Sequence, residues 1–246
     1  MKWFVCSLVA LLLADSAIQA AMIHDYEFQG NLNDSLGGPA LVSQGGTVGN
    51  GSYTFGMNQG LTLSNGLPGN DNANYTIELV FHFDNIGGYR KIIDTKNRTI
   101  DQQLYTYNGN LDYYPQSYNS TAPLVAGVDA RVVMTRDGTT NVLAGYVNGV
   151  QQFSFTDSGN SGVFDQANNI ITFFEDDVQS GYNEASPGVV RLIRIYDTAL
   201  SAAEVAALGG PNLTATPEPA SLTLLGLGLA GLAGYGWRRR KQPVST

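Results

Sequence analysis

The chain has 246 residues, 43% of them hydrophobic, and its 13 basic and 21 acidic residues give a net charge of −8. An acidic surface repels phosphate backbones, which argues against a nucleic-acid partner. The one cysteine, Cys6, lies in an apolar N-terminal segment, so the rest of the chain can form no disulfide bond and has no thiolate chemistry.

The first predicted element is a secretory signal peptide over residues 1–20. Lys2 precedes an apolar stretch at residues 3–14, and small residues follow at Ala17 and Ala20. This is the three-part layout of a signal peptide, with cleavage expected after Ala20. The segment indicates that the chain is exported across the inner membrane.

Residues 22–209 are predicted to form one all-β domain, because this span contains no repeat, charge block or internal linker. Between residues 22 and 215, 8 of the 13 basic and 19 of the 21 acidic residues remain, since Lys2, the four tail cations, Asp15 and Glu218 lie outside. The net charge of the exported part is therefore near −11. Such a surface attracts divalent cations.

Strand patterns dominate the domain. Residues 75–83 alternate apolar and polar side chains, which predicts a strand with one buried and one wet face. Residues 131–135 and 142–147 are expected to pair, and Val147-Asn148-Gly149-Val150 predicts a second hairpin with positive φ in its turn. Residues 189–196 form a further predicted strand. Short strands separated by Gly, Asn and Asp favour a sandwich or barrel.

One helix is predicted near the end of the domain. Ser201 and Glu204 have capping-box spacing, residues 205–208 follow, and Gly209 ends the helix. We expect this helix of about two turns to pack across one end of the sandwich. Residues 210–219 then form a linker.

The C-terminal tail has three parts in a fixed order. Pro217-Glu218-Pro219 comes first, an uncharged apolar run of 18 residues follows at 220–237, and Arg238, Arg239, Arg240 and Lys241 end it. At about 1.5 Å of rise per residue, the run spans about 27 Å and can just cross a bilayer. Residues 220–241 are therefore predicted to be a transmembrane helix whose basic end stays in the cytoplasm.

This tail resembles the PEP-CTERM sorting signal of Gram-negative bacteria. The resemblance implies that an exosortase-type membrane protease is a partner, that it cuts at Pro217-Glu218-Pro219, and that the helix holds the protein in the inner membrane only transiently. The mature protein is then expected at the cell surface or outside the cell. An ordinary single-span tail anchor is the alternative.

The elements of the domain, in their order, resemble the laminin-G-like, concanavalin A-type jelly roll. The segments that carry the resemblance are residues 25–28, 30–35, 75–83, 146–149, 194–197 and 199–205. The resemblance implies a sandwich of two antiparallel sheets with one short C-terminal helix. Lectins, adhesion modules and some polysaccharide hydrolases share this fold, so the fold alone does not select a function.

Catalytic patterns are weak. Hydrolases that cut β-glucans on this fold carry an E-x-D-x-x-E strand, which places two carboxylates about 5 Å apart on one face. No segment has that spacing, and the consecutive Glu175, Asp176 and Asp177 would point to opposite faces of a strand. We therefore assign no catalytic residue and expect no enzyme, although a Ser/His/Asp site built from distant residues stays open.

A tyrosine-rich segment is the first candidate binding surface. Flat rings bordered by polar groups suit a sugar, whose C–H face stacks while its hydroxyls form hydrogen bonds. The candidate ligand-binding residues are Tyr105, Tyr107, Asp112, Tyr113, Tyr114 and Tyr118. The alternative is that these tyrosines are ordinary residues of an amphipathic sandwich.

An acidic segment is the second candidate. Asp176, Asp177 and Glu184 offer oxygen ligands beside a loop glycine, Gly181, and calcium prefers such ligands. These three residues are the candidate ligands of a Ca²⁺ cofactor. The alternative is a solvated polar loop, since the segment lacks the register of a calcium-binding loop.

Taken together, these patterns predict an exported, non-enzymatic carbohydrate-binding protein of the cell surface or extracellular matrix. Its expected ligand is a polysaccharide or other glycan, associated with bacterial exopolysaccharide. A polysaccharide hydrolase or lyase on the same fold is one alternative. A calcium-dependent module that adheres to another protein is the second.

Overall fold

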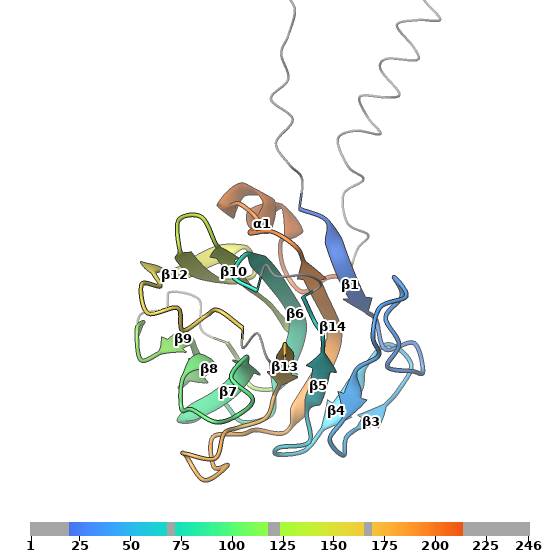
Figure 1. The fold of residues 1–246 in the computed structure, drawn as a ribbon. Coiled ribbons are helices and arrows are strands. Elements are labelled where there is room, and N and C mark those ends of the chain that lie inside the picture. Colours follow the sequence, from blue (N-terminus) through green and yellow to red (C-terminus); the bar gives the residue numbers. More distant parts are fainter. Residues whose placement is uncertain (1–19, 68–71, 118–123, 165–168, 214–246) are drawn as a thin grey trace, which may run out of the picture. The chain divides into compact units, whose positions relative to one another are not determined.

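The structure is a computed structural model that describes residues 20–67, 72–117, 124–164 and 169–213 (Figure 1). The compact unit that carries all the strands ends at Pro211. Residues 1–19 of the predicted signal peptide, Tyr118, and residues 214–246, which include the end of the predicted linker and the predicted sorting helix at 220–241, lie outside the described residues.

The larger sheet contains eight strands, all paired antiparallel. Its spatial order is β12 (Val150–Thr156), β11 (Val142–Val147), β10 (Ala130–Asp137), β6 (Tyr75–Phe83), β14 (Gly188–Tyr196), β4 (Tyr53–Phe55) and β3 (Thr47–Val48), with β1 (Met22–Tyr26) also paired to β14. β14 pairs with β4 near its start and with β1 near its end.

The smaller sheet contains six antiparallel strands. Its order is β2 (Val42–Ser43), β5 (Leu61–Ser64), β13 (Ile170–Phe173), β7 (Tyr89–Asp94), β8 (Gln103–Tyr107) and β9 (Asn110–Tyr114). The two sheets stack as the layers of a sandwich (Figure 1). The predicted all-β, two-sheet antiparallel fold is confirmed.

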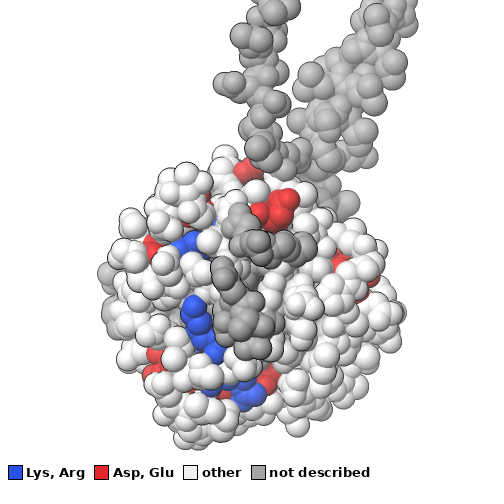
Figure 2. Space-filling view, viewed as in Figure 1, with Lys and Arg blue, Asp and Glu red and all other residues white. Residues whose placement is uncertain are grey.

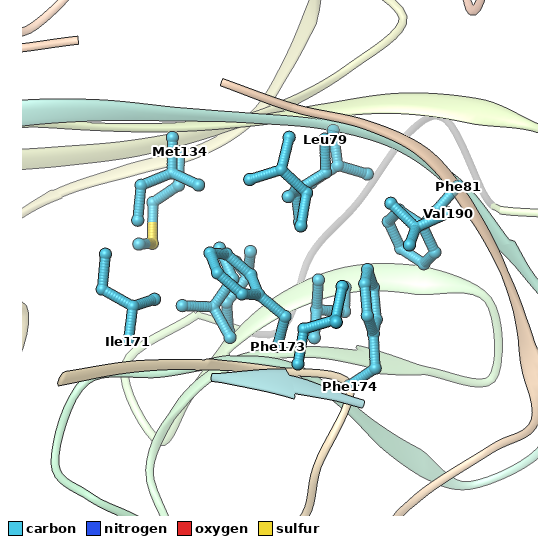
Figure 3. Close-up of a cluster of buried hydrophobic side chains, with 14 of the residues drawn as sticks. Leu79, Phe81, Met134, Ile171, Phe173, Phe174 and Val190 are labelled. Carbon is cyan, nitrogen blue, oxygen red and sulfur yellow. The ribbon is translucent and has the colours of Figure 1, made fainter. Parts of the chain in front are cut away.

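One hydrophobic core lies between the sheets (Figure 3). The larger sheet supplies side chains such as Leu79, Phe81, Met134 and Val190, and the β13 region of the smaller sheet supplies Ile171, Phe173 and Phe174. Ring contacts add directional packing, for example Phe55 stacked on Phe174 with centroids 4.6 Å apart. This core fixes the smaller sheet in place, so the outer face of that sheet is a rigid platform.

The strand at 75–83 has the predicted bounds, but its expected wet face is wrong. Thr76, Glu78 and Val80 are all fully buried. Glu78 is paired with Arg131 and accepts a hydrogen bond from the Tyr196 hydroxyl at 2.8 Å. Because neighbouring strands supply partners for its polar side chains, this strand is buried on both faces despite its alternating pattern.

The predicted hairpins and helix are present. Asn148 and Gly149 have φ of 51° and 81° in the turn between β11 and β12, as that two-residue turn requires. The helix α1 (Ala202–Leu208) has the full capping box of Ser201 and Glu204, and Gly209 ends it with φ of 67°.

Helix α1 covers part of the larger sheet. Its one buried side chain, Val205, packs with Val133 of β10 and with Ala144 and Tyr146 of β11. These three side chains lie on the opposite face from the core residues Val132 and Leu143. The helix therefore lies on the outer face of β10 and β11, whereas the sequence led us to expect it across one end of the sandwich.

Candidate functional site

The candidate site begins on the outer face of the three strands β7, β8 and β9. Tyr89 lies opposite Tyr107, Lys91 opposite Tyr105, and Tyr105 opposite Asp112 in the antiparallel register. Because cross-strand partners and residues two apart share a face, these side chains lie together. A two-residue turn, Asn108-Gly109, joins β8 to β9.

Four tyrosines form a cluster on this face, which we call the tyrosine cluster: Tyr89, Tyr105, Tyr107 and Tyr114. The ring centroid of Tyr89 lies 4.4 Å from that of Tyr107, 5.4 Å from that of Tyr114 and 5.7 Å from that of Tyr105. Tyr105 is fully buried beneath the others, whereas Tyr107 is 42% exposed. The cluster thus exposes part of the Tyr107 ring to solvent, while the buried ring of Tyr105 supports the cluster from below.

The structure brings together Tyr105, Tyr107 and Tyr114 from the predicted set, but it places Tyr113 elsewhere. Tyr113 is fully buried in the core, with its ring 5.3 Å from that of Phe155. The ligand-binding role predicted for Tyr113 is therefore wrong, because neighbouring residues of a strand point to opposite faces. Tyr118 lies outside the described residues.

Asp112 lies on the same face as Tyr105 and is only 1% exposed. Neither of its carboxylate oxygens has a hydrogen-bond partner within the described part of the chain. Burial raises the pKa of Asp112 to about 6, an effect that the backbone amide of Tyr113 only partly offsets. This carboxylate is buried at a real cost in stability.

The acidic loop, residues 175–184, folds against the tyrosine cluster. The Tyr105 hydroxyl lies 3.1 Å from Asp177 Oδ2, and the other oxygen of Asp177 accepts the amides of Gln179 at 2.8 Å and Ser180 at 3.2 Å. Asp177 has no exposed side-chain surface. The two surfaces predicted separately from sequence therefore contact each other and form one candidate site.

Lys91 supplies the cation of this site. Its Nζ lies 3.0 Å from Asp177 Oδ2, 3.5 Å from Asp94 Oδ2 and 4.2 Å from the centroid of the Tyr105 ring, and it donates to the Gln102 carbonyl at 2.8 Å. Burial alone would raise the pKa of Asp177, but the hydrogen bond and charge of Lys91 hold that pKa below its usual value.

Asp176 and Glu175 each use one carboxylate oxygen in contacts with the protein. Asp176 Oδ2 accepts the Ser180 hydroxyl at 2.5 Å and the Glu184 amide at 2.7 Å, and Glu175 is paired with Arg98 at 2.6 Å. Across the described ranges, no three His, Cys, Asp or Glu side chains are placed to hold a metal ion. Both oxygens of Asp177 and Oδ2 of Asp176 have internal donors, whereas Oδ1 of Asp176 has none in the described residues, so calcium binding by this loop stays a prediction.

A small pocket opens where the loop meets the cluster. Tyr89, Asp101, Tyr114 and Glu184 line it, and its volume is about 80 Å³. The Tyr105 hydroxyl donates toward Asp101 Oδ1 at 2.8 Å, and this bond fixes one wall. Burial, together with the charges of Asp101, Asp176 and Asp177, raises the pKa of Glu184 to about 7.

Sequence reasoning missed two residues of this pocket. Tyr89 begins β7, which follows Gly87-Gly88 and could have been recognised from the Tyr-Arg-Lys-Ile-Ile-Asp run at 89–94. No local signal marks Asp101, which lies in the connection between β7 and β8.

Figure 2 shows that charged groups form small separate groups on the viewed surface, not one extended patch.

The chain belongs to the concanavalin A-like lectin/glucanases superfamily, whose laminin-G-type family matches residues 54–206. The PEP-CTERM protein-sorting motif matches residues 215–241. Both resemblances recognised in the sequence are confirmed. Among the curated proteins compared with the chain, none matches.

Three solved structures illustrate the likeness in fold. Domain 4 of an extracellular GH43 arabinanase from Geobacillus stearothermophilus, in complex with arabinotriose, superposes with a TM-score of 0.57 at 19% identity, covering 77% of this chain and 98% of that one. Trypanosoma rangeli sialidase superposes with a TM-score of 0.57 at 16% identity, covering 76% of this chain and 32% of the sialidase. The botulinum neurotoxin serotype D binding domain superposes with a TM-score of 0.53 at 15% identity, covering 76% of this chain and 51% of that domain.

These likenesses show the fold alone, because all three identities are below 20%. The chain spans about a third of the sialidase and half of the neurotoxin domain. Glycosidases and sialidases share this fold with lectins and binding domains. The choice between binding and catalysis therefore depends on the site.

The sorting motif implies a secreted protein that is processed at the membrane. No helix within the described segments is long and apolar enough to cross a bilayer. The predicted transmembrane run at 220–237, Pro217-Glu218-Pro219 and Arg238, Arg239 and Arg240 all lie beyond those segments.

Proposed function

We propose that this chain is an exported carbohydrate-binding protein that holds a glycan at the tyrosine cluster. The single observation that carries the proposal is the half-exposed ring of Tyr107, 4.4 Å from the ring of Tyr89, which lines a pocket with two carboxylates. An exposed ring stacks on the C–H face of a sugar, and nearby carboxylates accept its hydroxyl groups. The glycan is the producer's own exopolysaccharide, and the protein is located at the cell surface or in the matrix.

The superfamily and the arabinotriose complex support a glycan as ligand, although only through the fold. The pocket is too small to enclose a sugar chain, at about 80 Å³. A glycan would therefore lie across the outer face of β7–β9 and place one group in the pocket. This open geometry favours a binding protein over an enzyme that must surround its reacting bond.

Retention of the purified protein on immobilised exopolysaccharide tests the proposal. Tyr107→Ala should weaken retention about fivefold to tenfold, because a lost aromatic stack costs on the order of 1 kcal/mol. Tyr107→Phe keeps the ring and should bind like the wild type. Val150→Ala, on the exposed part of β12, serves as a surface control. Equal retention of Tyr107→Ala and wild type would reject the site.

A polysaccharide hydrolase is the alternative that one observation favours. Glu184, with its pKa raised to about 7, lies beside Asp101 in the same pocket, and an acid with a raised pKa next to a second carboxylate is the arrangement that glycosidases use. Release of reducing ends from a glycan panel distinguishes the two functions. A binding protein releases none, whereas a hydrolase loses its activity in Glu184→Gln.

We also propose that an exosortase-type protease removes the C-terminal segment while the inner membrane holds it. Replacing Pro217-Glu218-Pro219 with three alanines should leave the protein at full length in the membrane fraction. Processing at an unchanged rate would contradict this role for the tripeptide. The glycan-binding proposal would be unaffected by that result.

A further inference from the structure

We propose that the pocket between Tyr89 and Tyr114 takes a protonated amine, so that the glycan bound is one with free amino groups, such as a polymer of de-N-acetylated hexosamine. This inference rests on the proposed function and specifies its substrate class. It also extends the site to Asp101 and Glu184, which bind the ammonium group rather than sugar hydroxyls.

The aromatic walls suit a cation. An ammonium group is attracted to the face of a tyrosine within about 6 Å of its centroid. Tyr89 and Tyr114 line the pocket with their rings at 70° to one another, so two rings border the same space in different orientations. Aromatic walls of this kind are a recurrent means of recognising ammonium ligands.

The protein already binds one ammonium group in this way. Lys91 Nζ lies 4.2 Å from the Tyr105 ring centroid and 3.0 Å from Asp177 Oδ2. The pocket repeats the same combination, a tyrosine ring beside a carboxylate, with Tyr89 or Tyr114 and Glu184 or Asp101. An amine in the pocket would therefore have the same kinds of partners as the internal one.

The charge of the pocket is left for a ligand to neutralise. Within the described residues, the Glu184 carboxylate makes no hydrogen bond or ion pair, and Asp101 accepts only the Tyr105 hydroxyl. Among the nearby cations, Lys91 is paired with Asp177 and Asp94, and Arg98 with Glu175. The Arg90 guanidinium donates to the carbonyls of Tyr89 and Asn183, at 2.8 and 3.5 Å. Burial, and after it the repulsion from neighbouring carboxylates, raises the pKa of Glu184, and binding an amine would relieve that repulsion.

The same charges disfavour the opposite class of sugar. A uronic or sialic acid would bring a carboxylate toward Asp101 and Glu184, and like charges at close range repel. A neutral sugar avoids the repulsion but leaves the carboxylates uncompensated. Charge complementarity therefore selects an amino sugar.

The size of the pocket fits an amine-bearing group. One water molecule needs about 10–15 Å³ of cavity volume. The volume of this pocket, about 80 Å³, therefore admits a group of a few heavy atoms. The amino group of a hexosamine and its adjacent ring carbon are of this size, and an N-acetyl group adds three heavy atoms that carry no charge. The remainder of the sugar would lie over Tyr107.

Two defined probes test the inference: the trimer of glucosamine and the trimer of N-acetylglucosamine, titrated calorimetrically at a pH where the amines are protonated. The wild type should bind the glucosamine trimer at least about tenfold more tightly, a difference of about 1.4 kcal/mol. Glu184→Gln and Asp101→Asn should remove most of that preference. Glu27→Gln, which removes a 48% exposed carboxylate elsewhere, should keep it.

The outcomes separate this inference from the proposed function. Equal binding of the two trimers, or an equal effect of Glu27→Gln and Glu184→Gln, would overturn the amine site, since general acidity would then explain the attraction. Retention of exopolysaccharide that still depends on Tyr107 would leave glycan binding intact in that case. If Tyr107→Ala changes binding of neither the trimers nor the exopolysaccharide, both proposals fail.

Discussion

The hydroxyl of Tyr105 lies 3.1 Å from Asp177 Oδ2, a contact that joins a strand to a loop 72 residues further along the chain. Both groups are fully buried. The same hydroxyl lies 2.8 Å from Asp101 Oδ1. Through this one atom the tyrosine cluster, the acidic loop and the pocket wall are held in a single arrangement.

Removal of that hydroxyl should destabilise the domain. Tyr105→Phe leaves the ring in place but removes the single O–H donor that lies between two carboxylates, so we expect a loss of about 1–3 kcal/mol in the free energy of unfolding. Tyr107→Phe, at a half-exposed ring, should cost less than about 0.5 kcal/mol. Urea denaturation of both variants measures the difference. Equal stability of the two would show that the buried hydroxyl contributes nothing.

Lys91 should be more important than an ordinary surface lysine. Its ammonium is enclosed with Asp177 and Asp94, all three side chains having no exposed surface. Lys91→Met leaves two buried carboxylates without their cation, and breaking a buried pair in this way costs about 3–5 kcal/mol. Chemical denaturation measures the loss.

The matched control for Lys91 is a double variant. Lys91→Met combined with Asp177→Asn removes the uncompensated charge as well, so part of the lost stability should return. A loss below about 1 kcal/mol for Lys91→Met alone, the value of an exposed pair, would contradict the buried geometry.

Local chemistry made parts of the fold predictable from sequence. The turn at Asn148-Gly149 and the capping box at Ser201 depend on residues that are neighbours along the chain, and both are present. The period-two rule also separates Tyr113 from Tyr114, and applying it strictly would have removed Tyr113 from the predicted surface.

The site itself depends on contacts that no local pattern encodes. Asp177 meets Lys91 and Tyr105 only because β13 pairs with β7 and β7 with β8. Glu78 looked solvent-facing, yet Arg131 and Tyr196 from neighbouring strands enclose it. Pairing order is a property of the whole sheet, so the acidic and aromatic segments could be recognised separately but not joined.

Asp112 predicts how stability depends on pH. Its pKa in the folded protein is raised to about 6, above the unfolded value of about 3.9, so the folded state binds the extra proton. Its contribution to stability is present below about pH 4 and is lost as pH rises through about 6. Burial also raises the pKa values of Glu184 and Glu175, each to about 7. Their ionisation therefore lowers stability further as the pH rises through about 7.

Asp112→Asn tests this assignment. The neutral amide removes the cost of burying a charge, so the variant should gain on the order of 2 kcal/mol relative to wild type near pH 7.5 and little near pH 4.5. Thermal melting across that range measures the convergence of the two curves. A constant difference at every pH would mean that packing, and not ionisation, distinguishes the variants.

The melting temperature in calcium and in chelator tests the metal role predicted for Asp176, Asp177 and Glu184. Asp177 Oδ1 already accepts two backbone amides and Oδ2 faces Lys91, so we expect the wild type to melt at the same temperature in millimolar calcium and in chelator. Asp177→Ala should lower the melting temperature by roughly 10 °C in both, because it breaks a buried ion pair. A rise with calcium in the wild type that Asp177→Ala abolishes would instead establish a metal site at Asp177.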